Sequence, residues 1–223
     1  MNGWSAIAVS PPLVDAVDVF VAGTGAVRAA VGGEAVGAAW DAPSILEGQT
    51  VGGLAGHLAR TGGWIVGEYL DLGTPDGPIQ FADAGDYYAR LMDQMDDDAH
   101  RAIRDRGAAL GAPGQDALVA ELDARLAGQE ARLAALDEDA LVAAYGGQAM
   151  RVRDYLVTRV VEQVVHLDDL ARSVGAPGWP LPPAGVDLAL AVAVDDGRRR
   201  RGDAAVLRAL YRRGEAEGAL PVL

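Results

Sequence analysis

The chain has 223 residues, half of them hydrophobic, and a formal net charge of −13. This length fits one domain of ordinary size, or one domain with a small appendage, and the acidic balance argues against nucleic acid as a partner because phosphates require a basic surface. The chain contains neither cysteine nor lysine, which excludes disulfides, thiolate metal ligands from the protein, a cysteine nucleophile and a Schiff-base lysine.

The apolar runs of the sequence are too short for a membrane span, and the chain does not open with the basic and apolar pattern of a secretory signal. We therefore expect a cytoplasmic protein without membrane contacts. Aromatic residues make up only 5 % of the chain, so its core must consist mostly of Ala, Val and Leu. Such small side chains suit helices that pack closely.

Apolar residues at helical spacing predict a first helix over 13–31 and a second over about 51–69, with a loop at 40–44 between them. Thr50 is the expected N-cap of the second helix. That helix contains several glycines, each of which costs about 1 kcal/mol relative to alanine. They indicate a close helix contact, access for a substrate, or a helix end near Gly62, and the sequence leaves these three explanations open.

The remaining helices are expected over about 83–108, 116–135, 152–174, 186–194 and 203–213, with a linker or short turn at 136–145 and a proline-rich connector at 179–183. Gly175 closes the long helix over 152–174. No segment shows convincing strand alternation or a hairpin turn. A helical bundle is therefore the simplest fold, and we expect a main domain over 1–178 and a C-terminal helical extension over 179–223.

Glu162 and His166 lie four residues apart in the long helix, so their side chains project from the same face. Valine and leucine neighbours indicate that this face is buried, and a buried ionisable pair costs several kcal/mol unless its charge is compensated. A divalent metal would compensate it, and zinc accepts both ligand types. One further ligand would leave the open position that catalytic zinc uses. The alternative for such a pair is an ordinary contact on a helix surface.

The third ligand must come from another histidine, and the chain has only two more. His57 shares an apolar helix face with Leu54 and Leu58, which should point into a core. His100 lies in the charged stretch 96–101, which is typical of a solvated surface. His57 is therefore the better candidate.

Two blocks of sequence resemble a known family. The stretch Trp40-Asp-Ala-Pro-Ser44, followed by Thr50-Val-Gly-Gly-Leu-Ala-Gly-His57-Leu58, resembles the N-terminal metal-ligand segment of mycothiol-dependent maleylpyruvate isomerases. The stretch from Arg153 to Ala171 resembles their second ligand segment, and the resemblance covers roughly residues 15–175.

The resemblance implies an all-α, DinB-like four-helix bundle with a short C-terminal helical extension. It also implies that His57, Glu162 and His166 bind Zn²⁺ or another divalent metal. The chain departs from the family at Gln49, where an aromatic residue is common. The arginine that the C-terminal region of these isomerases contributes to the substrate site has no counterpart here that can be aligned by motif.

The same resemblance implies thiol-dependent chemistry. Only a few per cent of a free thiol is ionised at neutral pH, whereas coordination to zinc stabilises the thiolate. Because the protein has no cysteine, mycothiol would serve as cosubstrate, and its metal-bound thiolate would add to a small electrophile in an S-transfer or a cis–trans isomerisation. The alternatives are a hydrolase that uses zinc-bound water and a non-catalytic, metal-stabilised binding or regulatory protein. We expect a monomer or a homodimer.

Several residues near the ligands are candidates for catalytic roles. Asp169 lies three residues after His166 and is expected to orient a ligand, or else to be a surface or capping carboxylate. Arg153 and Arg159 flank the ligands, and either could bind a substrate carboxylate or form a salt bridge with one of the many acidic residues. Tyr155 either lines a pocket or is simply packed.

Overall fold

The computed structural model describes residues 9–91 and 95–212, and most of them are helical. The elements, in chain order, are α1 Leu13–Val31, α2 Glu34–Ala38, α3 Val51–Ala59, α4 Ile65–Asp71, α5 Ala84–Leu91, α6 Asp97–Gly111, α7 Gln115–Leu126, α8 Gln129–Ala134, β1 Leu141–Ala143, β2 Ala149–Arg151, α9 Val152–Val174, α10 Pro183–Arg201 and α11 Asp203–Tyr211. A π-helical turn, Arg60–Trp64, joins α3 to α4, and a 3-10 turn, Tyr145–Gly147, lies between the strands. The predicted all-α class is confirmed.

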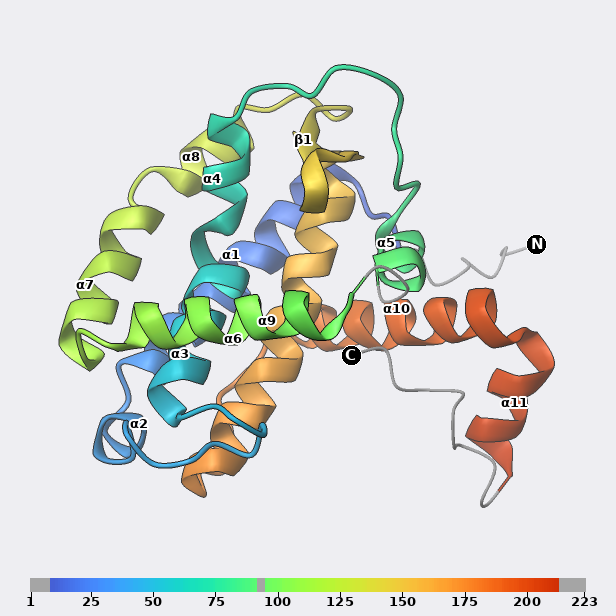
Figure 1. The fold of residues 1–223 in the computed structure, drawn as a ribbon. Coiled ribbons are helices and arrows are strands. Elements are labelled where there is room, and N and C mark those ends of the chain that lie inside the picture. Colours follow the sequence, from blue (N-terminus) through green and yellow to red (C-terminus); the bar gives the residue numbers. More distant parts are fainter. Residues whose placement is uncertain (1–8, 92–94, 213–223) are drawn as a thin grey trace.

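The long helix α9 is the centre of the arrangement (Figure 1). It packs against α1 on one side and against α3 on another, and α3 in turn packs against α6. Helix α10 lies against α5 and α9, and α11 folds back from the end of α10 at the edge of the molecule. The segments that carry His57 and Glu162, which are far apart in the sequence, are therefore neighbours in space.

Buried apolar side chains form two clusters. Along α9, the fully buried members of the first cluster end at Val161, and those of the second begin at Leu167. Along α1, the first cluster ends at Phe20 and the second begins at Ala26. Polar side chains occupy the level between the clusters, and we call them the polar layer: Thr24, His57, Thr61, Glu162, Gln163 and His166.

Two helix predictions are confirmed at both ends. Helix α1 covers 13–31 and α9 covers 152–174, as expected. Gly175 follows α9 with φ 65°, in the left-handed conformation that favours glycine at a helix C-terminus. At the start of α3, the Thr50 hydroxyl accepts a hydrogen bond from the Gly53 N–H at 3.0 Å, which satisfies one of the unpaired donors of the first turn.

The glycines of α3 are explained by its close approach to α6. A Cβ atom on Gly107 of α6 would lie 2.7 Å from the Gly53 carbonyl oxygen, and one on Gly56 would collide with the Gly107 carbonyl oxygen. The backbones of the two helices are therefore in direct contact, which only glycine permits. Gly62 does not end the helix but lies in the π-helical turn, so close helix contact is the explanation that holds for α3.

The single helix predicted over 83–108 is wrong, because α5 and α6 are separate helices. Asp96 is not helical, and its side chain accepts a hydrogen bond from the Ala99 N–H at 2.8 Å. It is thus the N-cap of α6, and Asp97 and Asp98 lie in the first turn, where negative charge is favourable. The acidic run is the start signal of a helix.

The sequence predicted no strands, and this prediction is wrong because a short hairpin lies between α8 and α9. β1 pairs with β2 in antiparallel fashion, and Gly146 and Gly147 turn the chain with φ values of 69° and 78°. A Gly-Gly pair is a turn signal because positive φ favours glycine. The strands, however, have three residues each, which is too short for alternation to be visible.

The helix predicted over 116–135 is interrupted. Helix α7 ends at Leu126 and α8 begins at Gln129, because Gly128 between them adopts φ 78°. The left-handed conformation of one glycine reorients the chain, so the leucine spacing continues across two helices rather than one.

The C-terminal helices also differ in length from those predicted. The segment predicted over 186–194 belongs to a helix that begins at Pro183, where proline is favoured as the first helical residue, and continues to Arg201. The helix predicted over 203–213 is α11, and Arg213 lies outside the described residues.

Helix α10 is attached to the body by apolar and ionic contacts. Ala189 and Val192 belong to the first core cluster. The Arg199 guanidinium contacts Asp195 at 2.7 Å on its own helix and Asp83 at 2.8 Å, just before α5. The extension therefore supports α5, and the domain division between residues 178 and 179 stays a prediction.

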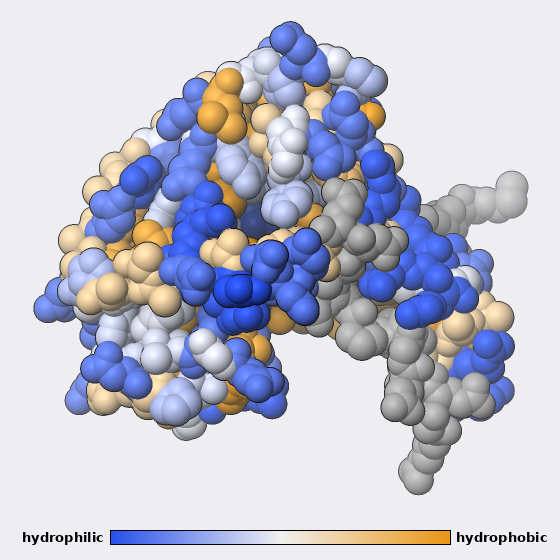
Figure 2. All heavy atoms as spheres, in the orientation of Figure 1, coloured by the Kyte–Doolittle hydropathy of each residue, from blue (hydrophilic) through white to orange (hydrophobic). Residues whose placement is uncertain are grey.

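None of the helices in the described ranges combines the length and the apolar character that crossing a bilayer requires. In the view of Figure 2, hydrophilic residues cover much of the surface, and apolar residues form scattered patches between them.

The close contact of α3 with α6 leads to a stability prediction. We expect Gly56→Ala to lower the free energy of unfolding by about 1–3 kcal/mol, because its Cβ would collide with backbone of α6 that cannot move independently. Gly25→Ala in α1 is the matched control, since nothing lies within 4 Å of a Cβ there. The control should gain up to about 1 kcal/mol from helix propensity. Urea unfolding of both variants measures the difference, and equal stabilities would contradict the assigned contact.

Candidate metal centre

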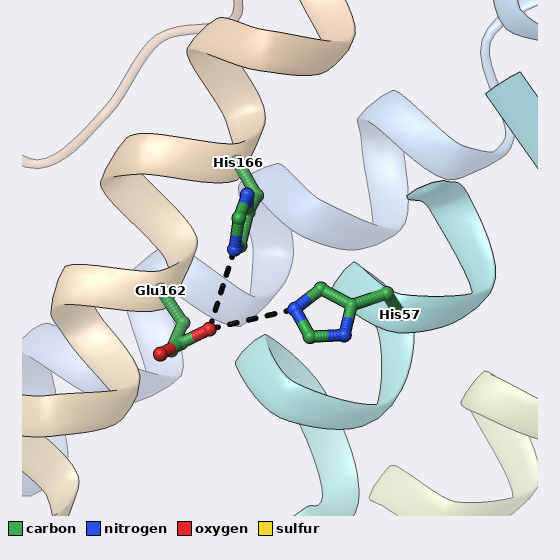
Figure 3. Close-up of side chains that lie close together, drawn as sticks. All are labelled: His57, Glu162 and His166. Atoms are coloured by element: carbon green, nitrogen blue, oxygen red, sulfur yellow. Dashed lines mark ion pairs between the residues drawn. The ribbon is translucent and has the colours of Figure 1, made fainter. Parts of the chain in front are cut away.

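Three side chains of the polar layer converge between α3 and α9 (Figure 3). His57 comes from α3, and Glu162 and His166 come from successive turns of α9. Glu162 Oε2 lies 3.4 Å from His166 Nε2 and 3.6 Å from His57 Nε2. The candidate ligand atoms of the three residues all lie within 4.8 Å of one another. His100, in α6, is not part of this group.

These distances can be compared with the requirements of a tetrahedral metal ion. Bonds of about 2.0–2.1 Å at tetrahedral angles place two ligand atoms about 3.3–3.4 Å apart. The separations of 3.4 and 3.6 Å are close to this value and are long for direct hydrogen bonds. Two imidazole nitrogens and one carboxylate oxygen are also a donor set that divalent zinc accepts. The donor set and the two separations from Glu162 Oε2 are therefore ones that a divalent metal ion could use.

Asp169 determines how His166 faces this centre. Its Oδ2 lies 3.0 Å from His166 Nδ1, so the other ring nitrogen, Nε2, is directed at Glu162. Metal-binding histidines commonly have such a carboxylate on the second nitrogen, because it fixes the ring orientation and the tautomer. Asp168, the preceding residue, is exposed and lies 3.8 Å from Arg172.

The second oxygen of Glu162 faces two other side chains. The Tyr88 hydroxyl lies 3.2 Å from Oε1 and 3.0 Å from the Thr158 carbonyl oxygen, and it donates its one proton to either. The Arg159 guanidinium lies 3.9 Å from Oε1. Oε1 is thus occupied by protein groups, which leaves Oε2 for the centre between the histidines.

The ionisable side chains of the centre are buried, and both burial and neighbouring charges shift their pKa values. Burial alone would raise the pKa of Glu162, but the contacts with His166 and His57 and the charge of Arg159 lower it well below its usual range. Burial would likewise lower the pKa of His166, yet Asp169 and Glu162 raise it to about 9. Burial lowers the pKa of His57. A cation bound here would compensate the carboxylate charge and would compete with a proton for His166 Nε2.

Gln163, the neighbour of Glu162, ties α9 to α1 and to the π-helical turn. Its Nε2 lies 2.7 Å from the Gly62 carbonyl oxygen and 3.1 Å from that of Phe20. Gly23 of α1 has no Cβ, and the space is filled by the Gln163 amide. π-Helical turns are frequent at functional sites, and this one begins at Arg60, one turn of helix after His57.

The two candidate arginines lie in different places. Arg159 is almost fully buried, and its guanidinium lies beside Glu162. Arg153 lies in the first turn of α9, where it contacts Glu138 at 2.5 Å. It does not belong to the pocket described next.

A pocket of about 640 Å³, including the solvent space at its mouth, opens beside the centre. His57, Glu162 and Arg159 form part of its wall, together with Tyr155, which the sequence left open as a pocket residue. Sequence reasoning did not identify Tyr69, Tyr87 and Tyr145, which also line it. They come from three separate elements, and no local spacing relates them to the ligands.

Of the comparisons with known proteins, one identifies a family. A family model described as "Mycothiol maleylpyruvate isomerase N-terminal domain" matches residues 20–171, which include all three converging side chains. No curated protein and no solved structure matches the chain.

Proposed function

Because the chain belongs to the mycothiol maleylpyruvate isomerase N-terminal domain family, we propose that it is a metal-dependent enzyme that uses mycothiol. His57, Glu162 and His166 hold the metal, which we take to be Zn²⁺ or another divalent ion. The reaction is an S-transfer to a small electrophile or its cis–trans isomerisation.

The observation that carries this proposal is the convergence of three nitrogen and oxygen donors from two helices, of which His57 and Glu162 also line a pocket. Three protein ligands leave one position of a tetrahedral ion for a substrate. Since the chain has no cysteine, a sulfur nucleophile must come from a small thiol. The fourth coordination position is therefore where the external thiol would bind.

A divalent metal held there keeps a thiol in its nucleophilic thiolate form at neutral pH. Asp169 holds the His166 ring by its Nδ1, and Tyr88 fixes Glu162 by Oε1. Arg159 lies where it can bind an anionic group of the electrophile. Arg153 is left out of this machinery, because Glu138 engages it away from the pocket.

The two reactions share their first bond. In both, the sulfur forms a bond to one carbon of an electrophilic double bond. In an isomerase, rotation about the resulting single bond is followed by breakage of the same carbon–sulfur bond, which returns the thiol and the trans isomer. In a transferase, the carbon–sulfur bond is kept and the thiol proton ends on the adjacent carbon.

Metal binding is the first test. After removal of metal with a chelator, the wild-type protein should bind one Zn²⁺ in a competition titration, and binding should raise its melting temperature. His57→Ala and His166→Ala should lose this site, because two ligands hold zinc weakly. His100→Ala is the matched control and should bind as the wild type does. Zinc binding that survives both ligand substitutions would refute the assigned site.

Mycothiol binding separates the functional alternatives. The zinc-loaded protein should bind mycothiol in calorimetry, and the metal-free protein and His57→Ala should not. Binding of metal without thiol, and no turnover with any electrophile, would favour a non-catalytic protein. Metal without thiol affinity, but with hydrolytic turnover, would favour a hydrolase.

The contact of Asp169 with His166 gives a further prediction. Asp169→Ala should weaken zinc binding about 10- to 100-fold, because the His166 ring loses the partner that fixes its orientation. Asp168→Ala removes a neighbouring carboxylate of the same helix and should leave zinc affinity unchanged. The comparison, made by the same competition titration, cancels general effects of charge on metal attraction. Equal losses in both variants would mean that Asp169 acts only through its charge.

A further inference from the structure

The pocket beside the metal centre is rich in tyrosine, although aromatic residues are scarce in the chain. Four of the six tyrosines line it, from α4, α5, the 3-10 turn and α9: Tyr69, Tyr87, Tyr145 and Tyr155. The rings of Tyr69 and Tyr155 lie 5.6 Å apart at 33° and form one wall. Such a concentration of flat side chains provides faces on which a planar group can pack.

Two of these tyrosines carry hydroxyls without a protein partner. Tyr87 and Tyr155 are 4 % and 1 % exposed, and within residues 9–91 and 95–212 neither hydroxyl forms a hydrogen bond. Tyr88, by contrast, is bound to Thr158 and Glu162. Buried tyrosine hydroxyls usually find a partner, so two unpaired ones in the wall of one pocket indicate a ligand with acceptor atoms. Burial raises the pKa of Tyr87 to about 12, so its hydroxyl is a neutral donor.

Arg159 adds a positive charge to the same wall. Its side chain is 5 % exposed, its guanidinium lies over the Tyr155 ring, and its Nε donates to Thr158 Oγ1 at 3.0 Å. Its terminal nitrogens form no hydrogen bond within the described part of the chain, where Glu162 at 3.9 Å is its only ion-pair partner. A buried charge with so distant a counter-ion is costly. If Glu162 binds a metal, the need for an anion beside Arg159 increases.

The rest of the lining is largely apolar, with Ile65, Leu91, Met95, Ile103 and Leu110 among its residues. Two other arginines reach the pocket, but they provide no second buried cation. Arg60 is neutralised by Glu68 at 2.7 Å, and Arg106 is exposed. An exposed charge contributes little to binding, so the lining favours one anionic group and an apolar body.

We propose that this pocket selects a monocarboxylic acid with a flat, apolar body, such as an aromatic ring. The carboxylate binds the Arg159 guanidinium and the hydroxyls of Tyr87 and Tyr155, and the body packs among the aromatic and aliphatic side chains. As a statement about the enzyme's electrophile, the inference rests on the proposed function. Recognition of the acid itself requires neither metal nor thiol.

Three probes of similar geometry test this inference by calorimetry. trans-Cinnamate has one carboxylate and a ring, cinnamamide is its neutral counterpart, and fumarate replaces the ring by a second carboxylate. The titrations use the protein as purified and again after chelation, since the chelated form excludes direct binding of a carboxylate to metal. Cinnamate should bind at least about tenfold more tightly than either of the others in both forms. Equal affinity for cinnamamide, or tighter binding of fumarate, would overturn the proposal.

Two arginine variants locate the carboxylate. Arg159→Gln should weaken cinnamate binding about tenfold or more, whereas Arg106→Gln, which neutralises an exposed arginine of the same pocket, should change it less than about twofold. Tyr87→Phe removes only a hydroxyl and should weaken cinnamate binding several-fold. This variant serves as the test if thermal unfolding shows that Arg159→Gln does not fold. A larger loss in Arg106→Gln than in the other two would place the carboxylate at the mouth and refute the assignment.

The failure of this inference and that of the proposed function give different results. If zinc and mycothiol bind but cinnamate is not preferred, the substrate class is wrong and the metal-dependent function stands. If cinnamate binds with the expected preference but zinc does not, the pocket is an acid-binding site and the metal proposal fails.

Discussion

The burial of the Glu162 carboxylate is the constraint on which the rest of the structure depends. It lies between two apolar clusters, where an isolated charge would cost several kcal/mol. His57 and His166 face one of its oxygens, and Tyr88 and Arg159 face the other. Packed apolar residues of similar size would serve stability at least as well. The cation that we propose for this site would offset the cost of the arrangement.

The surrounding helices leave a pocket beside the buried Glu162 carboxylate. Helix α6 can lie across α3 because glycines remove the side chains between them, and its Ile103 and Leu110 then form one side of the pocket. Helix α5 contributes Tyr87 and Tyr88, and the contact of Arg199 with Asp83 ties α10 to the chain just before α5. Residues 179–212, the part of the C-terminal extension that the structure describes, therefore support the wall of the site without contributing a residue to the pocket lining.

Local signals in the sequence predicted the helices that have clear ends, and they failed where a single residue interrupts a regular pattern. Helix α9 has a glycine in the left-handed conformation at its end, and its range is confirmed. Asp96 divides the helix predicted over 83–108 because its carboxylate caps α6, a start signal that periodicity alone does not distinguish from a solvated surface. The hairpin around Gly146 and Gly147 was missed because hydrogen bonds between short strands leave little trace in periodicity.

For the site, the spacing of Glu162 and His166 placed both side chains on one face, and His57 followed as the histidine on an apolar helix. The family also could be inferred from sequence, and the family model confirms it. The tertiary structure alone decided that Arg159 faces the pocket while Arg153 contacts Glu138, and that tyrosines from four elements meet there. Helical periodicity specifies which side chains share a face. Which distant segment covers that face depends on packing between helices, and only the folded chain contains that information.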